Sequence, residues 1–273
     1  MNLEKNIPMR LMALVFLYTV STMQGGLASP SSRQIVGEAF ELKSSKLLYS
    51  EIHCAGEDHA SEVIYRHRDG SLIAHKRLDY QSGAYTPSFV QHNIQSDEKI
   101  EVNFDQEAVS MSVTTSGIRK QENMHPVTDI AKKPVVIDAG FDGFIRGNWE
   151  KLVAGDTLEL QFPLAYRSSM VSLRVKASAC SYETDGADQC FTLEASNWFY
   201  RMLSSPIELG YDPEQLRLAR YRGLSNINDE QGKGLVVDIK YSYRALPVAA
   251  CDTDLLLLSE NITSLATLAP HQP

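Results

Sequence analysis

Residues 60–80, ASEVIYRHRDGSLIAHKRLDY, are the part of this 273-residue chain that predicts its fold class most directly. Asp69-Gly70 is expected to form a type I′ hairpin turn, in which both central residues take positive φ. On either side of the turn, every second residue is directed to the same face of the hairpin. These residues are Val63, Tyr65 and His67 before the turn, and Leu72, Ala74 and Lys76 after it. The stretch is therefore expected to form two antiparallel strands with one apolar face and one polar face.

Strand signals extend outward from this hairpin over most of the chain. The clearest further runs are 89–94, 99–104, 109–115, 157–164, 171–179, 190–195, 207–211, 216–221 and 235–243. Short runs separated by polar turns indicate an antiparallel meander. The fold class is therefore predicted to be mainly β, as a strongly curved antiparallel sheet or an incomplete barrel.

One helix is predicted near the centre of the chain, at residues 138–152 (DAGFDGFIRGNWEKL). Its large apolar residues recur at helical spacing and share one face. They are Phe141, Phe144, Ile145, Trp149 and Leu152. Asp138 is the expected N-cap, and Gly155 is expected to end the helix. The glycines at 140, 143 and 147 each lower helix stability by about 1 kcal/mol. Either packing against the sheet compensates for them, or they admit a close neighbour.

The two ends of the chain are predicted to be distinct from this body. Residues 1–28 have a positive flank, a ten-residue apolar run at 11–20 and small residues before a cleavage site after Ala28, which is typical of a signal peptide. Residues 29–245 are expected to form a single antiparallel β domain. Residues 246–273 form a tail with a short amphipathic helix. Its apolar positions are Leu255, Leu258, Ile262, Leu265 and Ala269. We expect the mature chain to be soluble in the periplasm, with no membrane span after cleavage.

The charge argues against nucleic acid as a partner. The chain has 26 basic and 34 acidic residues and a formal charge of −8. Loss of Glu4, Lys5 and Arg10 with the signal peptide would leave the mature chain one unit more negative. Nucleic-acid binders usually need a net basic surface, and an acidic surface also disfavours anionic headgroups.

Four cysteines remain after cleavage, and two disulfides are the favoured interpretation in an oxidising compartment. Cys180 and Cys190 flank a polar loop between two strand-like runs, which makes their pairing easy to close. Cys54 would then pair with Cys251. Free buried thiols are the second option, and the spacing of Cys and His matches no recognised metal site.

The sequence contains few candidates for chemistry, and no catalytic or cofactor-binding motif is recognisable. A possible polar site combines Asp138, Asp142 and Arg146 from the central helix with Asn226 from the loop at 225–229. A surface ion pair between Asp142 and Arg146, four residues apart, explains part of this set without any ligand. A shared site requires a fold that brings the two segments together.

Two segments carry a resemblance to a known family. YRGLSNINDEQGK with LVVDIKYSY (residues 221–233 and 235–243), and VIDAGFDGFIRGNW (136–149), resemble an uncharacterised family of exported proteobacterial proteins. The resemblance covers most of residues 36 to 245, and it implies no activity. In outline, the chain is also similar to periplasmic half-barrels that carry lipoproteins, although that likeness rests on no shared motif.

These features predict an exported, non-enzymatic protein that binds a hydrophobic small molecule, a lipid or a lipidated partner in the cell envelope. A curved sheet with a packed helix can enclose an apolar cavity. Phe141, Phe144, Ile145 and Trp149 would then line that cavity. The alternative is an envelope module that binds another protein through a sheet edge or the C-terminal helix. A hydrolase without a familiar motif is a further alternative, and no cofactor is expected in any of the three.

Overall fold

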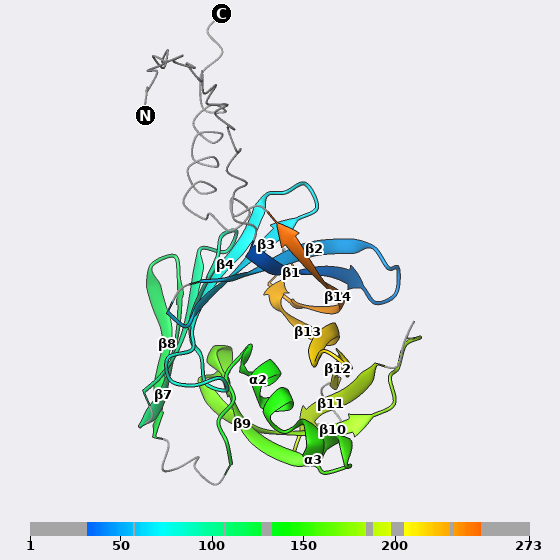
Figure 1. Cartoon of the computed structure of the whole chain (residues 1–273). Helices are drawn as coiled ribbons and strands as arrows, with labels where there is room; N and C mark the ends of the chain where they lie inside the picture. The colour runs from blue at the N-terminus through cyan, green and yellow to red at the C-terminus, as the bar shows by residue number, and fades with distance from the viewer. Residues whose placement is uncertain are drawn as a thin grey trace, which may run out of the picture.

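Fourteen antiparallel strands form one curved sheet in the computed structural model of the chain (Figure 1). The structure describes residues 32–56, 58–105, 107–126, 133–183, 188–197, 205–229 and 232–246. The strand order is β8-β7-β6-β5-β4-β3-β2-β1-β14-β13-β12-β11-β10-β9. Within the described residues, the end strands β8 and β9 do not pair with each other, so the barrel is incomplete. The predicted fold class, a mainly β protein with a curved antiparallel sheet, is confirmed.

The strands are short and their connections are mostly tight hairpins, as expected of a meander. Along the chain they are β1 Ser32–Glu41, β2 Leu47–Ala55, β3 Ala60–His67, β4 Leu72–Asp79, β5 Ser88–Asn93, β6 Glu98–Phe104, β7 Ala108–Thr115, β8 Ile118–Pro126, β9 Leu158–Leu164, β10 Ser169–Ser178, β11 Gln189–Ala195, β12 Ile207–Asp212, β13 Arg217–Asn228 and β14 Gly234–Leu246. The helices are α2 Gly140–Gly147, α3 Trp149–Val153 and the 3₁₀ turn η1 Ala165–Arg167.

The β3–β4 hairpin forms where the sequence predicts it, but its turn has a different geometry. Gly70 has φ 92°, whereas Asp69 is not among the residues with positive φ. The backbone N–H of Gly70 donates to the His67 carbonyl, and the N–H of His67 donates to the Ser71 carbonyl. The predicted type I′ turn, which needs positive φ at two successive residues, is therefore wrong. The loop between β3 and β4 is longer than a two-residue turn, and it reverses the chain direction with Gly70 as its glycine of positive φ.

The predicted central helix is present, but as two short helices. α2 ends at Gly147 and α3 begins at Trp149, with Asn148 between them. The Asn148 side chain donates from Nδ2 to the Phe144 carbonyl at 2.9 Å, and thereby satisfies a carbonyl at the end of α2. Asp138 is not the N-cap, because Ala139 occupies that position without a side-chain cap. A single helix over 138–152 with Asp138 as its N-cap is thus corrected to α2 and α3.

Both helices lie inside the curve of the sheet (Figure 1). Phe144, Ile145 and Leu152 are fully buried there against side chains of β9 to β12. The glycines of α2 admit a close neighbour, as the sequence allowed. A Cβ at Gly143 would lie 2.6 Å from the Ala84 carbonyl oxygen, and one at Gly140 or Gly147 would collide with Tyr85. The loop before β5 therefore packs directly on the backbone of α2.

The two ends of the sheet, at β8 and β9, are connected by hydrogen bonds that involve side chains of β8 and β6 and the turn η1 with the residue after it. The Ser168 carbonyl, after η1, accepts hydrogen bonds from Asn123 Nδ2 at 3.0 Å and His125 Nε2 at 3.1 Å, both on β8. Tyr166 in η1 donates its hydroxyl to Glu98 Oε1 on β6 at 2.6 Å. We refer to these contacts as the seam.

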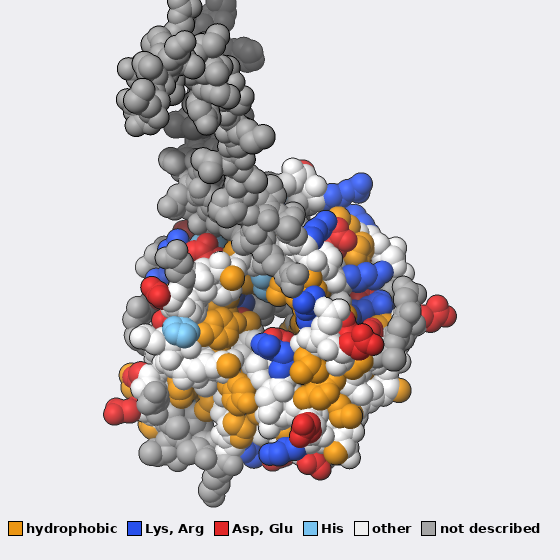
Figure 2. All heavy atoms as spheres, viewed as in Figure 1, with side chains coloured by type: hydrophobic (Ala, Val, Ile, Leu, Met, Phe, Trp, Pro, Cys, Tyr) orange, Lys and Arg blue, Asp and Glu red, His pale blue; other side chains and the backbone are white. Residues whose placement is uncertain are grey.

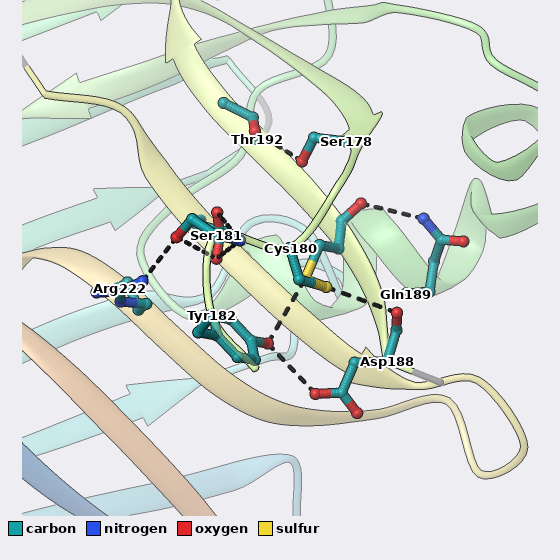
Figure 3. Close-up of a disulfide and its surroundings, with 10 residues drawn as sticks. Ser178, Cys180, Ser181, Tyr182, Asp188, Gln189, Thr192 and Arg222 are labelled. Atoms are coloured by element: carbon teal, nitrogen blue, oxygen red, sulfur yellow. Dashed lines mark hydrogen bonds between the residues drawn. A yellow bond between two sulfur atoms is a disulfide. The ribbon is translucent and has the colours of Figure 1, made fainter. Parts of the chain in front are cut away.

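Cys180 and Cys190 form a disulfide across the β10–β11 connection, which confirms that pairing (Figure 3). Nearby, Arg222 on β13 donates to Ser181 Oγ at 2.6 Å, so the loop is also held to a more distant strand. Cys54 is disulfide-bonded as well. Its predicted partner, Cys251, lies outside the described residues.

Two further predictions fall outside the described residues. These are the signal peptide at 1–28 and the amphipathic helix between residues 255 and 269. Among the helices that the structure describes, none is long and apolar enough to span a membrane.

Candidate functional site

The inner face of the sheet carries a row of polar and aromatic residues that the register places side by side. Tyr241 on β14 pairs with Gly37 on β1, Gly37 with Glu51 on β2, and Glu51 with Tyr65 on β3. Directly paired residues in antiparallel strands share a face. We call Glu51, His53, Lys76, Asp138, Asn226 and Tyr241 the inner polar site.

Glu51 is the most enclosed acid of this site, with a side chain that is 6% exposed. Its Oε1 accepts hydrogen bonds from the Tyr241 hydroxyl at 2.7 Å and from His53 Nε2 at 2.9 Å. Burial alone would raise the pKa of Glu51, but the bonds from His53 and Tyr241 and the nearby Lys76 charge outweigh it. The pKa of Glu51 is therefore below its usual value of 4.5, and the carboxylate is ionised at neutral pH.

Gly37 provides the space in which Glu51 and Tyr241 meet. A Cβ at this position would lie 2.7 Å from Glu51 Cγ and 2.8 Å from Tyr241 Cε1. Burial first, and then the Glu51 charge, raises the pKa of the Tyr241 hydroxyl well above its usual value. Tyr241 thus stays a neutral hydrogen-bond donor to the carboxylate at neutral pH.

Lys76 forms the second ion pair of the site, with a side chain that is only 2% exposed. Its Nζ donates to both carboxylate oxygens of Asp138, at 2.8 and 2.9 Å. The ammonium also lies 5.0 Å from the centre of the Phe89 ring and 6.0 Å from that of Tyr65. A buried lysine is retained in charged form when a carboxylate and aromatic faces replace its water shell. Asp138 has φ 44°, a left-handed backbone conformation that is uncommon for residues other than glycine.

The structure brings together the two segments of the predicted polar site. Asn226 Nδ2 donates to Asp138 Oδ1 at 3.2 Å, although the residues are 88 positions apart. Asp142 pairs with Arg146 at 2.8 Å, as expected from their spacing, and also accepts the Tyr211 hydroxyl at 3.1 Å. Asp138 and Asn226 are therefore in contact, and Asp142 and Arg146 form a separate ion pair on α2. The role of these residues as a binding site stays a prediction.

Asn226 lies near the end of β13, where a register shift interrupts the pairing with β14 between Leu224 and Asn228. The predicted loop at 225–229 is thus largely strand, since β13 continues to Asn228 after a register shift beyond Leu224. Ser225 Oγ lies 2.7 Å from the Tyr49 hydroxyl, and the Asn226 carbonyl accepts Gln91 Nε2 at 3.2 Å. Ile227 is 3% exposed and packs in the core under β1 to β4. Through these contacts, the end of β13 is joined to β2 and β5, which lie elsewhere in the curved sheet.

A hollow opens between side chains near the centre of the face shown in Figure 2, with hydrophobic and charged groups around it. Four tyrosines of the interior are only half-buried. They are Tyr80, Tyr221, Tyr241 and Tyr243. Arg217 lies 4.9 Å from the centre of the Tyr243 ring. Burial, followed by the Asp142 charge, raises the pKa of Tyr243 to about 12. The accessible part of the interior is therefore aromatic, with a few charged groups that are already paired.

The four predicted apolar site residues lie in the other half of the interior. Phe141 stacks on Phe162 with ring centres 5.0 Å apart, and Trp149 packs edge-on against Phe191 at 5.2 Å. Phe144 and Ile145 are buried in the same cluster. These side chains fill the space between α2, α3 and strands β9 to β12. Their contact with a ligand stays a prediction.

Sequence reasoning missed Glu51, Lys76 and Tyr241. Lys76 carried a usable signal, because its alternation places it on the apolar face of β4 together with Ala74. A charged residue at a core-facing position is rarely buried without a partner. Glu51 and Tyr241 gave no comparable signal, because their proximity depends on the pairing of β1 with both β2 and β14. Within the described residues, no cluster of three or more His, Cys, Asp or Glu side chains could hold a metal ion.

Comparisons with known proteins show a remote likeness among solved structures. No model of a known protein family matches the sequence. No curated protein matches it either. Among solved structures, the chain is similar to a beta-barrel-like protein of the domain of unknown function DUF1849 from Brucella abortus. The alignment covers 80% of this chain and 100% of that chain, with 7% identity and a TM-score of 0.46. A likeness this remote carries no argument about function.

Proposed function

We propose that this chain is a non-enzymatic exported protein that binds an amphipathic or hydrophobic small molecule beside α2. The observation that carries the proposal is the combination of half-buried tyrosines with the enclosed ions of the inner polar site. Binding pockets for small molecules are mostly apolar and aromatic, with a few fixed polar groups that orient the ligand. A lipid or the acyl chain of a lipidated partner would satisfy this chemistry.

The charges of the site support a ligand that is largely uncharged. Lys76 is paired with Asp138, Asp142 with Arg146, and Glu51 holds two hydrogen bonds. Apolar side chains line the same inner face, among them Val237 and Ile239 on β14. A ligand entering here would gain contact with tyrosine rings and apolar walls, while its polar end could bond to tyrosine hydroxyls.

The disulfides support export, because such bonds persist mainly in oxidising compartments. We place the protein in the periplasm on this ground and on the predicted signal peptide at residues 1–28. The single β domain predicted for residues 29–245 is part of the same proposal.

Native mass spectrometry of the gently purified chain, with and without added long-chain fatty acid, tests the proposed binding. We expect a mass increase of one ligand, and displacement of an environment-sensitive fatty-acid dye. Gly37→Ala should weaken binding at least about tenfold, since the methyl group displaces Glu51 and Tyr241. The matched control is Gly210→Ala, where the added methyl meets Tyr182 near the disulfide instead. Absence of any bound lipid or dye, or equal loss in both variants, would contradict the proposal.

A further inference from the structure

Glu51 is the carboxylate of the inner polar site that has no lysine or arginine partner. Asp138, the other acid of this site, accepts hydrogen bonds from Lys76 on both of its oxygens. Among the described residues, His53 is the only basic side chain within ion-pair distance of Glu51, at 2.9 Å. With histidine counted as neutral, two carboxylates and one ammonium leave the site with one negative charge. The unbalanced charge lies on Glu51.

The protein uses only one of the two Glu51 oxygens. The Tyr241 hydroxyl and His53 Nε2 both donate to Oε1, at 2.7 and 2.9 Å. Within the part of the chain that the structure describes, Oε2 accepts no hydrogen bond. It keeps some contact with solvent, because it is not among the fully enclosed atoms that lack a partner. An ionised carboxylate accepts about two hydrogen bonds at each oxygen. Oε2 is therefore an available acceptor on a side chain that is only 6% exposed.

Tyrosines surround this carboxylate. Tyr65 is paired directly with Glu51 across β2 and β3, and Tyr49 lies two residues away on the same face of β2. Burial first, and then the Glu51 charge, raises the pKa of four tyrosine hydroxyls. They are Tyr49, Tyr65, Tyr221 and Tyr241. The faces of such rings attract cations. A positively charged group beside Glu51 would thus meet both an unbalanced carboxylate and aromatic side chains.

A metal ion is a poor match for this site. Calcium takes six to eight oxygen ligands, and magnesium requires six in near-ideal geometry. Among the residues that the structure places, no three His, Cys, Asp or Glu side chains lie close enough to share an ion. An organic ammonium group needs only one strong acceptor and apolar surroundings for its carbon chain. A primary ammonium also carries three N–H donors, one of which suits Oε2.

We propose that the ligand of the inner polar site is an aliphatic primary amine, whose ammonium group donates a hydrogen bond to Glu51 Oε2. Hydrogen bonds between two charged groups are roughly twice as strong as neutral ones. Folding has already removed Glu51 from most of its water, so only the ammonium group still has to be dehydrated on binding. The inference rests on the proposed function, and it assigns one positive charge to the polar end of an otherwise uncharged ligand.

Competition for the bound fatty-acid dye tests the proposal on the full chain. The competitors are octylamine, octanol and octanoate, which share one apolar chain and differ in the polar end. At about pH 8 a primary amine is protonated, whereas an ordinary histidine is neutral. Octylamine should displace the dye at a concentration at least about tenfold lower than octanol, and octanoate should be the weakest of the three. Octyltrimethylammonium has the same charge as octylamine but no N–H donor, so it should also compete less well than octylamine.

Glu51→Gln should reduce the tenfold preference for octylamine over octanol to about one, because the amide carries no charge. The matched control is Glu62→Gln on β3. Glu62 is paired with Cys54 in the register, so it lies on the face of the sheet opposite to Glu51. Glu62 also bonds to a histidine, His75, at 3.2 Å. Both variants change the net charge by one unit, and Glu62→Gln should keep the preference. Circular dichroism checks that both variants are folded.

The outcomes separate this inference from the proposed function. If the dye binds but octylamine and octanol compete equally, the amine is wrong and ligand binding is retained. If no dye binds at all, both proposals fail. A preference that persists in Glu51→Gln, or that is lost equally in Glu62→Gln, would mean that the overall negative charge attracts the amine, and would overturn the assignment to Glu51. Equal competition by octyltrimethylammonium would overturn the hydrogen bond to Oε2.

Discussion

Glu51 is the residue whose ionisation is most directly linked to the interior of the sheet. Its pKa is lowered in the folded chain, so between the folded and unfolded pKa values the unfolded state binds more protons. The ionised carboxylate therefore adds stability above about pH 4.5, and this contribution is lost as the pH falls through the folded pKa. The free energy of unfolding, measured in urea from pH 3 to 7, should decrease on the acid side of this window.

Glu51→Gln should reduce stability by about 1–3 kcal/mol at pH 7, because the amide is a weaker acceptor for Tyr241 and His53. The difference from the unchanged protein should shrink below pH 4.5. Tyr241→Phe should move the acid decrease to higher pH, because its hydroxyl helps to lower the Glu51 pKa. If the difference in unfolding free energy between Glu51→Gln and the unchanged protein were the same at every pH from 3 to 7, this interpretation would be wrong.

At the residue scale, the sequence predicted types of residue better than it predicted partners. Asp138 is predicted both as an N-cap and as part of a polar site; the N-cap role is wrong, and the site stays a prediction. Its partner Lys76 is 62 positions away on β4, and the four strands β5 to β8 lie between the two residues along the chain. Asp142 and Arg146 were predictable as a pair, since four residues of helix bring them together locally. Long-range pairs such as Glu51 and Tyr241 depend on sheet order, which alternation along one strand does not contain.

At the scale of elements, α2 shows why helix propensity alone misleads. Gly143→Ala should stabilise an isolated helix by about 1 kcal/mol. In this chain the added Cβ would lie 2.6 Å from the Ala84 carbonyl oxygen. This oxygen belongs to the backbone, so moving it away would cost free energy. We expect a net loss of about 1–3 kcal/mol in the free energy of unfolding by urea. Glu150→Ala on the exposed side of α3 is the control and should change stability by less than about 0.5 kcal/mol. An increase in stability for Gly143→Ala would show that the loop does not pack on α2 as described.

The Cys180–Cys190 disulfide holds one hairpin connection, and its removal should have a measurable cost. Closing a loop of this length stabilises a protein by about 3 kcal/mol in the chain-entropy model. The double variant Cys180→Ser with Cys190→Ser should therefore unfold at lower urea concentration. The Ser181 contacts with Arg222 and Glu208 remain, so the hairpin should still form (Figure 3). A stability equal to that of the unchanged chain would contradict the stabilising role.

Hairpins were the elements that the sequence predicted best, because each hairpin depends on residues that are close together in the chain. Alternation and turn residues within about 20 positions determine each hairpin. The break between α2 and α3 was not predictable in this way, because the apolar period continues through Asn148. The register shift in β13 was also missed. Its polar residues are typical of a loop, and only the contacts of Ser225 and Asn226 with distant strands hold them in place.

At the scale of the whole molecule, the curvature of the sheet brings its two end strands close together without pairing them. β8 has β7 as its only strand neighbour in the described part of the chain. On its other side, it is held by the bonds of Asn123 and His125 to the Ser168 carbonyl. An edge held by side chains opens at lower free energy than a strand hydrogen-bonded on both sides. The central strands β1 and β14 are paired along their whole lengths.

Weakening the seam should therefore release β8 while the rest of the sheet stays folded. We expect Asn123→Ala combined with Tyr166→Phe to speed amide hydrogen exchange in β8 at least about tenfold, because two hydrogen bonds of about 0.5–1.5 kcal/mol each are lost. Exchange in β1 and β14 should not change, since their protection requires opening of the central sheet. Tyr182→Phe, which removes a hydroxyl near the disulfide, is the control and should leave β8 unaffected. Equal acceleration in β8 and β14 would mean that the sheet opens as one cooperative unit, with the seam as part of its global stability. Unchanged exchange in β8 would mean that these side chains do not hold the edge.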